Sequence, residues 1–198
     1  MTTIYFVRHA QPDTSGGVNP EFTLTEQGKN DAEIVAGILY NRGITKIYSS
    51  SYIRAVQTVE SFAESENLEI IKEYDLRERT GGDWSKTDPT YTDYIFRQID
   101  DFSHKAPDGE SMNDVQNRTM PVIKRILSEN EGGTVAVATH GMALASVLKY
   151  YFPKFSAKDF EKIIKLMPFV LRTEFENGTI INYEIELAIR RVYPNNYI

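Results

Sequence analysis

Two of the three histidines in this 198-residue chain stand directly after apolar, β-branched runs. His9 follows the run 3–7 with Arg8 between them, and His140 follows the run 134–139. Such runs are typical of buried strands in a parallel sheet. Ligands bind beyond the carboxyl ends of the strands in open α/β sheets, so we expect the two imidazoles to face one ligand at that edge.

The residue types around these histidines suit the handling of a phosphoryl group. A neutral imidazole is a nucleophile that forms covalent intermediates, and a guanidinium group binds phosphate oxygens as a two-pronged donor. Arg8 adjoins His9, and Arg54 lies in the first turn of a predicted helix, where free backbone N–H groups also favour an anion. We therefore expect Arg8 and Arg54 to bind phosphate beside the histidines.

Further strands and helices must position these side chains. Short apolar runs predict strands at 44–49 and 68–72. Helical periodicity predicts helices at 25–42, 52–66, 111–129 and 142–152. In the first of these, Ile34, Val35, Ile38 and Leu39 lie on one face, and in the third a kink or break is expected at Pro121.

The C-terminal part of the chain has a different pattern. Alternating runs at 169–176 and 179–187 flank Asn177-Gly178, which predicts an antiparallel hairpin. The segment 80–107 is rich in Gly, Asp, Thr and Tyr, with a predicted helix at 89–102. We expect one domain over residues 1–198, an α/β fold of three layers (α/β/α) with a mostly parallel central sheet, and 80–107 as a cap or insertion over the active site.

Composition excludes several classes of protein. The net charge of -6 argues against a nucleic-acid surface, no apolar run is long enough to span a membrane, and the N-terminus has no secretion signal. With zero cysteines, a thiolate nucleophile and a cysteine zinc site are both absent. We expect a cytoplasmic protein that binds neither nucleic acid nor membrane.

Six short motifs occur in order along the chain: Arg8-His9-Ala10, Leu24-Thr-Glu-Gln-Gly28, Ser49 to Thr58 around Arg54, Leu76-Arg-Glu78, Gly109-Glu-Ser111 and Thr139-His140-Gly141. They resemble the motifs of the histidine phosphatase superfamily, which includes cofactor-dependent phosphoglycerate mutases and many phosphatases. One such match is weak, but six in order are specific.

The resemblance implies a phosphoglycerate mutase-like fold and a role for each matched residue. His9 attacks phosphorus, while Arg8, Arg54 and His140 hold the phosphoryl oxygens, without metal or cofactor. Glu78 is the implied general acid, and Glu110 is a rival carboxylate for that role. Gln11, Arg79 and Glu110 are further candidates for substrate contact. His104 has no motif around it and is expected to be a solvated loop residue.

Departures from the motifs bear on the substrate. Ala10 replaces the usual Gly, and Gln11-Pro12-Asp13 replaces a run that contacts phosphate in many members. The loop 14–19 lacks the pattern of a phosphoglycerate mutase, whereas Arg79 after Glu78 and Pro121 after Arg118 resemble one. Our leading hypothesis is a phosphatase that hydrolyses a small phosphomonoester through a phosphohistidine on His9. The alternatives are a cofactor-dependent phosphoglycerate mutase and a catalytically silent phosphate-binding module. The expected partner is a small phosphorylated metabolite, with a homodimer as a possible assembly.

Overall fold

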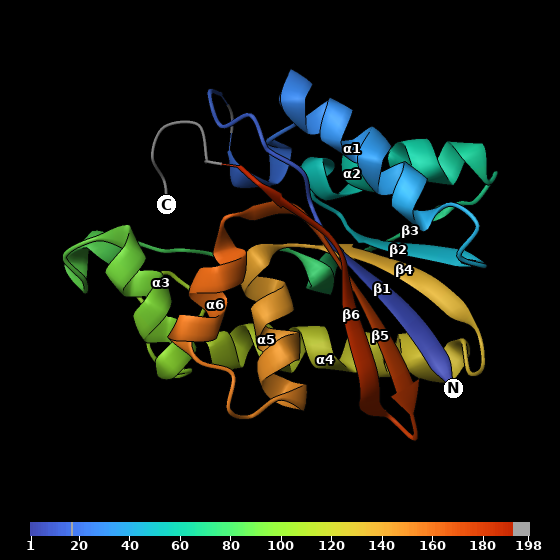
Figure 1. Ribbon diagram of the computed structural model, residues 1–198. Helices are drawn as coiled ribbons and strands as arrows, with labels where there is room; N and C mark the ends of the chain where they lie inside the picture. The colour runs from blue at the N-terminus through green and yellow to red at the C-terminus, as the bar shows by residue number, and fades with distance from the viewer. Residues whose placement is uncertain (17, 192–198) are drawn as a thin grey trace.

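A six-stranded sheet forms the centre of the protein (Figure 1). The computed structural model describes residues 1–16 and 18–191. The strand order is β3-β2-β4-β1-β5-β6. The bounds are Thr2–Arg8 for β1, Lys46–Ser50 for β2, Ile70–Glu73 for β3, Thr134–Thr139 for β4, Leu166–Glu176 for β5 and Thr179–Arg190 for β6.

The sheet is mostly parallel, as predicted. β1 pairs in parallel with β4, β4 with β2, and β2 with β3, while β5 runs antiparallel to β1 and to β6. The predicted hairpin joins β5 to β6, and its turn residues Asn177 and Gly178 have φ angles of 50° and 75°. Such positive φ angles are those of the tight turn that Asn-Gly favours.

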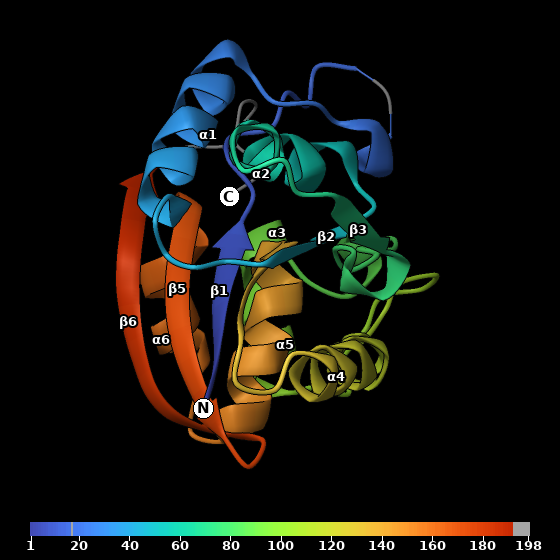
Figure 2. The same cartoon turned by 90° about the vertical axis from the view of Figure 1, so that its right-hand side faces the viewer.

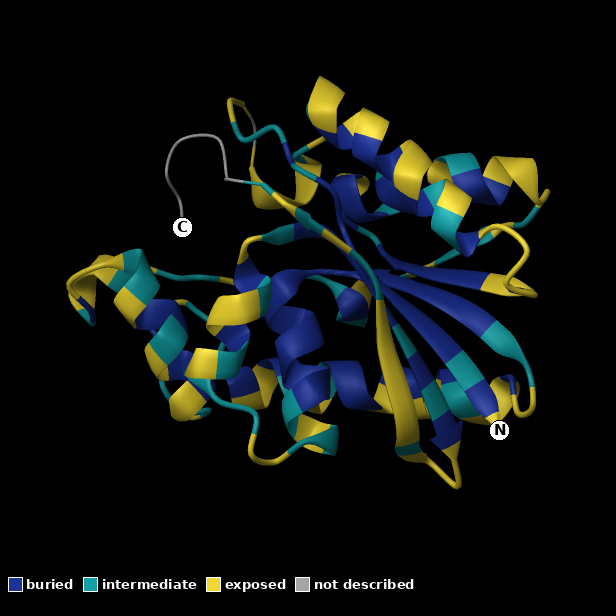
Figure 3. Cartoon of the chain, in the orientation of Figure 1, coloured by how far each residue is buried: buried dark blue, intermediate teal, exposed yellow. Residues whose placement is uncertain are grey.

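Helices cover both faces of the sheet and give the three-layer architecture (Figure 2). One face carries α1 and α2, and the other carries α4 and α5. Buried residues concentrate in β1, β2, β4 and β5 and on the inner sides of these helices, whereas β6 is mostly exposed (Figure 3). The bounds are Glu26–Leu39 for α1, Ile53–Ser65 for α2, Met112–Glu129 for α4 and Gly141–Tyr151 for α5.

The start of α4 shows how sequence fixes a helix boundary here. The Ser111 side chain accepts a hydrogen bond from the Asp114 backbone N–H, and the Asp114 carboxylate accepts one from the Ser111 backbone N–H. This reciprocal capping satisfies donors that the first turn leaves free. The sequence left open a kink or a break at Pro121, and the structure shows no break, since α4 continues through this residue.

The segment 80–107 contains a short 3-10 helix, η3 (Trp84–Lys86), and α3 (Tyr91–Asp100). Figure 1 shows α3 beside α6 (Ala157–Ile164), at the end of the molecule away from β6's hairpin turn. An apolar cluster joins the two helices to α5, and its members include Tyr94, Ile95, Ile99, Phe160, Ile164 and Met142.

Ile34 is 46% exposed, because the buried stripe of α1 follows Gly28, Ala32, Val35 and Leu39, and Ile34 lies one position off it. The expectation that His104 is a solvated loop residue was wrong. The His104 side chain is only 11% exposed and its Nε2 lies 2.7 Å from Asp88 Oδ2. A polar partner and the Tyr94 ring bury this histidine in the segment 80–107.

Within residues 1–16 and 18–191, no helix is both long and apolar enough to cross a bilayer.

Candidate active site

The two strand-end histidines meet, as the sequence predicts. Parallel pairing of β1 with β4 places Arg8 opposite Thr139, and the His9 backbone N–H donates to the Thr139 carbonyl oxygen at 3.1 Å. The ring centroids of His9 and His140 lie 5.1 Å apart. Both residues are 0% exposed, so the pair lies beneath the surface of the site.

The partner of His9 determines which nitrogen carries its proton. Nδ1 lies 2.7 Å from the Ala10 carbonyl oxygen, which can only accept, so Nδ1 carries the hydrogen. Nε2 is buried without a hydrogen-bond partner. Burial, and then the charges of Arg54 and Arg8, hold the pKa of His9 well below its usual value. The ring is therefore neutral near pH 7 and its free Nε2 bears a lone pair.

His140 is held through its other nitrogen. Its Nε2 lies 2.7 Å from Ser50 Oγ at the end of β2, and its Nδ1 is buried without a partner. The Tyr52 ring packs edge-on against it, with centroids 5.1 Å apart. Burial, followed by the charges of Arg54 and of His9, holds the pKa of His140 well below its usual value.

Arg8 is anchored through one arm of its guanidinium group. Nη1 donates to the carbonyl oxygens of Ile163, Ile164 and Leu166, at 3.0, 2.6 and 3.2 Å. These carbonyls lie at and just beyond the C-terminus of α6, where cations are favoured. Nε of Arg8 is buried without a partner, and the residue lines the pocket described below.

Arg54 lies in the first turn of α2 and is 3% exposed. Its Nη1 donates to the Asn19 carbonyl oxygen at 2.7 Å, which fixes the guanidinium plane. Arg54 lines the same pocket as Arg8, so the structure brings both predicted phosphate-binding arginines to one site.

The two rival carboxylates have different surroundings. Glu78 lines the pocket and accepts hydrogen bonds from the backbone N–H groups of Arg79, Met142 and Ala143, at 2.7, 3.1 and 3.3 Å. The last two donors open α5, whose N-terminus favours an anion. The structure therefore places Glu78 at the pocket wall, between the segment that follows η2 (Tyr74–Leu76) and α5.

Glu110 lies outside the pocket lining and belongs to an ion-pair network. Arg118 Nε and Nη2 contact its two oxygens at 2.7 and 3.0 Å, and Arg77 Nη2 contacts it at 3.2 Å. Burial alone raises the pKa of Glu110, but Arg118, the Thr80 N–H and Arg77 outweigh it and leave the pKa below its usual value. Glu110 therefore holds the segment after η2 against α4.

The other two candidates for substrate contact also differ. Gln11 bonds to Thr25, its Oε1 accepting from the Thr25 hydroxyl at 3.0 Å, and it is not among the pocket-lining residues. Arg79 lines the pocket and is 3% exposed. Its Nη2 donates to the Tyr91 hydroxyl at 3.1 Å, while Nε and Nη1 are buried without partners.

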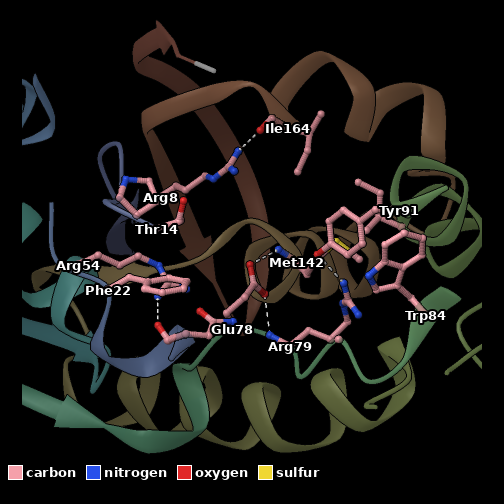
Figure 4. Close-up of a pocket in the computed structure, with 14 residues that line it drawn as sticks. Arg8, Thr14, Phe22, Arg54, Glu78, Arg79, Trp84, Tyr91, Met142 and Ile164 are labelled. Carbon is pink, nitrogen blue, oxygen red and sulfur yellow. Dashed lines mark hydrogen bonds between the residues drawn. The ribbon is translucent and has the colours of Figure 1, made fainter. Parts of the chain in front are cut away.

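A pocket of about 290 Å³ lies among Arg8, Arg54, Glu78 and Arg79 (Figure 4). One part of its lining is charged and contains Arg8, Arg54, Glu78 and Arg79. The remainder includes apolar and aromatic side chains from separate segments, which sequence reasoning did not bring together: Phe22, Trp84, Tyr91, Ile95, Met142 and Ile164. In Figure 4 Trp84 and Tyr91 lie on the Arg79 side of the pocket.

Within residues 1–16 and 18–191, no group of three or more His, Asp or Glu side chains is arranged to hold a metal ion. Three guanidinium groups and one carboxylate line the pocket, whereas the two neutral imidazoles are fully buried and are not among its lining residues.

Known proteins resemble this chain in both sequence and fold. Phosphoserine phosphatase 1 of Hydrogenobacter thermophilus is 29% identical over 160 residues, which cover 74% of each chain. A probable phosphoglycerate mutase of Serratia proteamaculans is 25% identical over 158 residues, covering 75% of this chain and 74% of that one. The structure of Bacillus stearothermophilus YhfR has a TM-score of 0.79 and 25% identity, covering 91% of this chain and 94% of that one.

The family comparison spans most of the chain. The sequence model of the histidine phosphatase superfamily (branch 1) matches residues 4–179. That range contains both histidines, the three arginines and Glu78 of the pocket region. The chain belongs to the histidine phosphatase superfamily.

Proposed function

We propose that this protein is a phosphatase that hydrolyses a small phosphomonoester through a phosphohistidine on His9. The observation that carries the proposal is the His9 Nε2 atom, a buried lone pair without a partner beside two arginines and a second imidazole. Membership of the histidine phosphatase superfamily, with a phosphatase among the similar proteins, supports a phosphoric monoester hydrolase.

In the first step, the lone pair of His9 Nε2 attacks phosphorus and the bond from phosphorus to the ester oxygen breaks. Glu78 starts this step as the carboxylic acid, although its three backbone N–H partners favour the carboxylate, and it donates its proton to the leaving oxygen. Arg8, Arg54 and His140 hold the phosphoryl oxygens and stabilise their charge. The Ala10 carbonyl oxygen, which accepts the Nδ1 hydrogen, stabilises the positive charge that the phosphorylated ring acquires.

In the second step, water attacks the phosphohistidine. The Glu78 carboxylate now accepts a proton from the water, the bond from Nε2 to phosphorus breaks, and inorganic phosphate leaves. The lone pair returns to Nε2 and the proton to Glu78, so the enzyme is regenerated. The same carboxyl group thus acts as acid and then as base.

Arg79 indicates the class of substrate. A buried guanidinium group with two unpartnered N–H groups is costly, and within the described ranges no carboxylate pairs with it. We propose that it binds a second acidic group of the substrate, a carboxylate or a further phosphate. The pocket of about 290 Å³ restricts the substrate to a small molecule. Phosphoserine, named for the relative from Hydrogenobacter thermophilus, has both groups.

Phosphate release from matched substrates tests this proposal. Phosphoserine and phosphoethanolamine share the same phosphate ester, but only phosphoserine carries a carboxylate. A charge-assisted hydrogen bond contributes about 1.5–3 kcal/mol, so kcat/KM is expected to be about 10–150-fold higher for phosphoserine. If no phosphate is released from these two or from a panel of phosphorylated sugars, acids and nucleotides, the proposal fails.

Mutase activity is the second candidate, and the similarity to a probable phosphoglycerate mutase favours it. Isomerisation of phosphoglycerate in the presence of a bisphosphoglycerate primer discriminates it from hydrolysis. A catalytically silent module would bind phosphate without forming acid-labile phosphate on His9. The homodimer and the cytoplasmic location remain predictions, which light scattering and cell fractionation test.

A further inference from the structure

We propose that Ser50 is a positioning residue that fixes the tautomer of His140, so that His140 presents an Nδ1–H donor to the phosphoryl group. The inference rests on the proposed function for its catalytic meaning, but the tautomer itself is a property of the resting protein. The sequence analysis assigned no role to Ser50, although it lies in the motif that contains Arg54.

Ser50 lies between two groups that it can join. It is the last residue of β2 and is 0% exposed. Its Oγ lies 2.7 Å from His140 Nε2 and also accepts a hydrogen bond from the Tyr52 backbone N–H at 3.2 Å. The hydroxyl is therefore held by the backbone on one side and faces the imidazole on the other.

The number of hydrogens decides between the two tautomers. A hydroxyl has one hydrogen to donate, and a neutral imidazole has one N–H and one lone pair. If Ser50 donates to Nε2, its hydrogen finds an acceptor, and the imidazole hydrogen must lie on Nδ1. If Nε2 donates to Ser50 instead, the hydrogen of the Ser50 hydroxyl has no acceptor within residues 1–16 and 18–191. The first arrangement is favoured because a buried unpaired donor costs about 1–3 kcal/mol.

This arrangement gives two adjacent imidazoles opposite properties. The Ala10 carbonyl oxygen leaves His9 with a bare lone pair on Nε2, which suits a nucleophile. Ser50 leaves His140 with an N–H on Nδ1, the atom that is buried without a partner. In the opposite tautomer His140 would turn a lone pair toward the phosphoryl oxygens and repel them. One hydroxyl group thus distinguishes the donor from the nucleophile.

Nitrogen-15 NMR of histidine-labelled protein tests the inference directly. The chain has three histidines, so His104→Gln and His140→Gln variants assign the signals. We expect His140 to carry its hydrogen on Nδ1 in the unmodified protein, and to become a mixture of tautomers in Ser50→Ala. We also expect kcat to fall about 10–100-fold in Ser50→Ala, the range found when a metal-bound histidine loses the hydrogen-bond partner that orients its ring. Ser50→Thr keeps the hydroxyl and is expected to restore both.

Ser49→Ala is the matched control. Ser49 is also 0% exposed and adjoins Ser50, but its hydroxyl donates to the Ser50 carbonyl oxygen at 2.9 Å and not to His140. We expect this variant to keep the tautomer and kcat. An Nε2–H tautomer in the unmodified protein overturns the inference, even if a variant fails to fold. An unchanged tautomer in folded Ser50→Ala also overturns it. Absence of phosphatase activity, by contrast, refutes the proposed function and leaves the tautomer measurable.

Discussion

Replacing Arg79 with methionine is expected to weaken catalysis while stabilising the fold. Methionine keeps much of the volume of the side chain but removes the buried charge. In the resting protein Arg79 Nε and Nη1 have no partners, although the residue is 3% exposed. A group kept at a cost to stability is typical of a functional site.

The magnitude follows from the contacts of Arg79. Each unpaired buried donor costs about 1–3 kcal/mol, so removing two relieves about 2–6 kcal/mol. The variant loses the hydrogen bond to the Tyr91 hydroxyl, about 1 kcal/mol, and the contact of the guanidinium with the Tyr94 ring at 4.9 Å, another 1 kcal/mol or so. The difference is a net gain of about 0–4 kcal/mol, and its midpoint of about 2 kcal/mol raises Tm by about 4–8 °C in a chain of this size.

Two assays on the same protein measure the two effects. Thermal unfolding gives the change in Tm, and phosphate release from phosphoserine and phosphoethanolamine gives the ratio of kcat/KM. We expect the preference of about 10–150-fold for phosphoserine to disappear in Arg79→Met. Arg77→Met is the control, because Arg77 pairs with Asp75 and Glu110 outside the pocket lining. That variant is expected to lose stability and to keep the preference.

A loss of stability in Arg79→Met with an unchanged substrate ratio would refute this reasoning. Arg79 would then be a structural residue whose contacts with Tyr91 and Tyr94 outweigh the cost of its buried donors.

Three further predictions concern the remaining site residues. Glu78→Gln is expected to lower kcat strongly. Glu110→Gln is expected to lower Tm and to change kcat little, because Glu110 pairs with Arg118 and Arg77. Kinetics and thermal unfolding of both variants check this. Arg54→Lys is expected to lower kcat/KM about 100-fold, since an ammonium group cannot replace the planar two-pronged donor; unchanged steady-state kinetics would contradict its role. The free energy of unfolding is expected to fall as pH drops below about 6.5, by up to about 1.4 kcal/mol per pH unit for each of His9 and His140. The reason is that burial and Arg54 lower both pKa values, so that only the unfolded chain takes up the protons. Urea titrations at pH 7.5 and 5.5 check this, and an unchanged pH dependence in a variant with both His9→Gln and His140→Gln would contradict it.

The sequence predicted those parts of the fold that depend on local pattern. The apolar runs before His9 and His140 predicted β1 and β4, and the rule for ligand sites in α/β sheets predicted that the two rings would meet. The Asn177-Gly178 turn predicted the β5–β6 hairpin. These features need only neighbours along the chain or a general rule of sheet geometry.

The helix α6 was missed although its signal is present. Ser156 and Asp159 form a reciprocal cap like that of α4, but the helix has only 8 residues, and strand β5 begins at Leu166, two residues after its end. Missing α6 also hid the anchor of Arg8, because the acceptors lie at and just beyond its C-terminus.

Residues that act through distant partners could not be placed from the sequence. Whether Glu78 or Glu110 reaches the pocket depends on Arg118, which captures Glu110 from α4. The apolar wall with Phe22 and Trp84 comes from segments that only tertiary packing brings together. The motif that contains Ser50 marked Arg54 for chemistry, whereas the contact of Ser50 with His140 crosses from β2 to the end of β4.

The most direct test of the account is the chemical state of His9 during turnover. Unmodified protein mixed with a phosphorus-32-labelled substrate and quenched within one turnover is expected to carry acid-labile, base-stable label, which peptide mass spectrometry places on His9. His9→Ala is expected to fold, to carry no label and to release no phosphate. Label on another residue, or full phosphate release by His9→Ala, would contradict the central claim that the free Nε2 lone pair is the nucleophile.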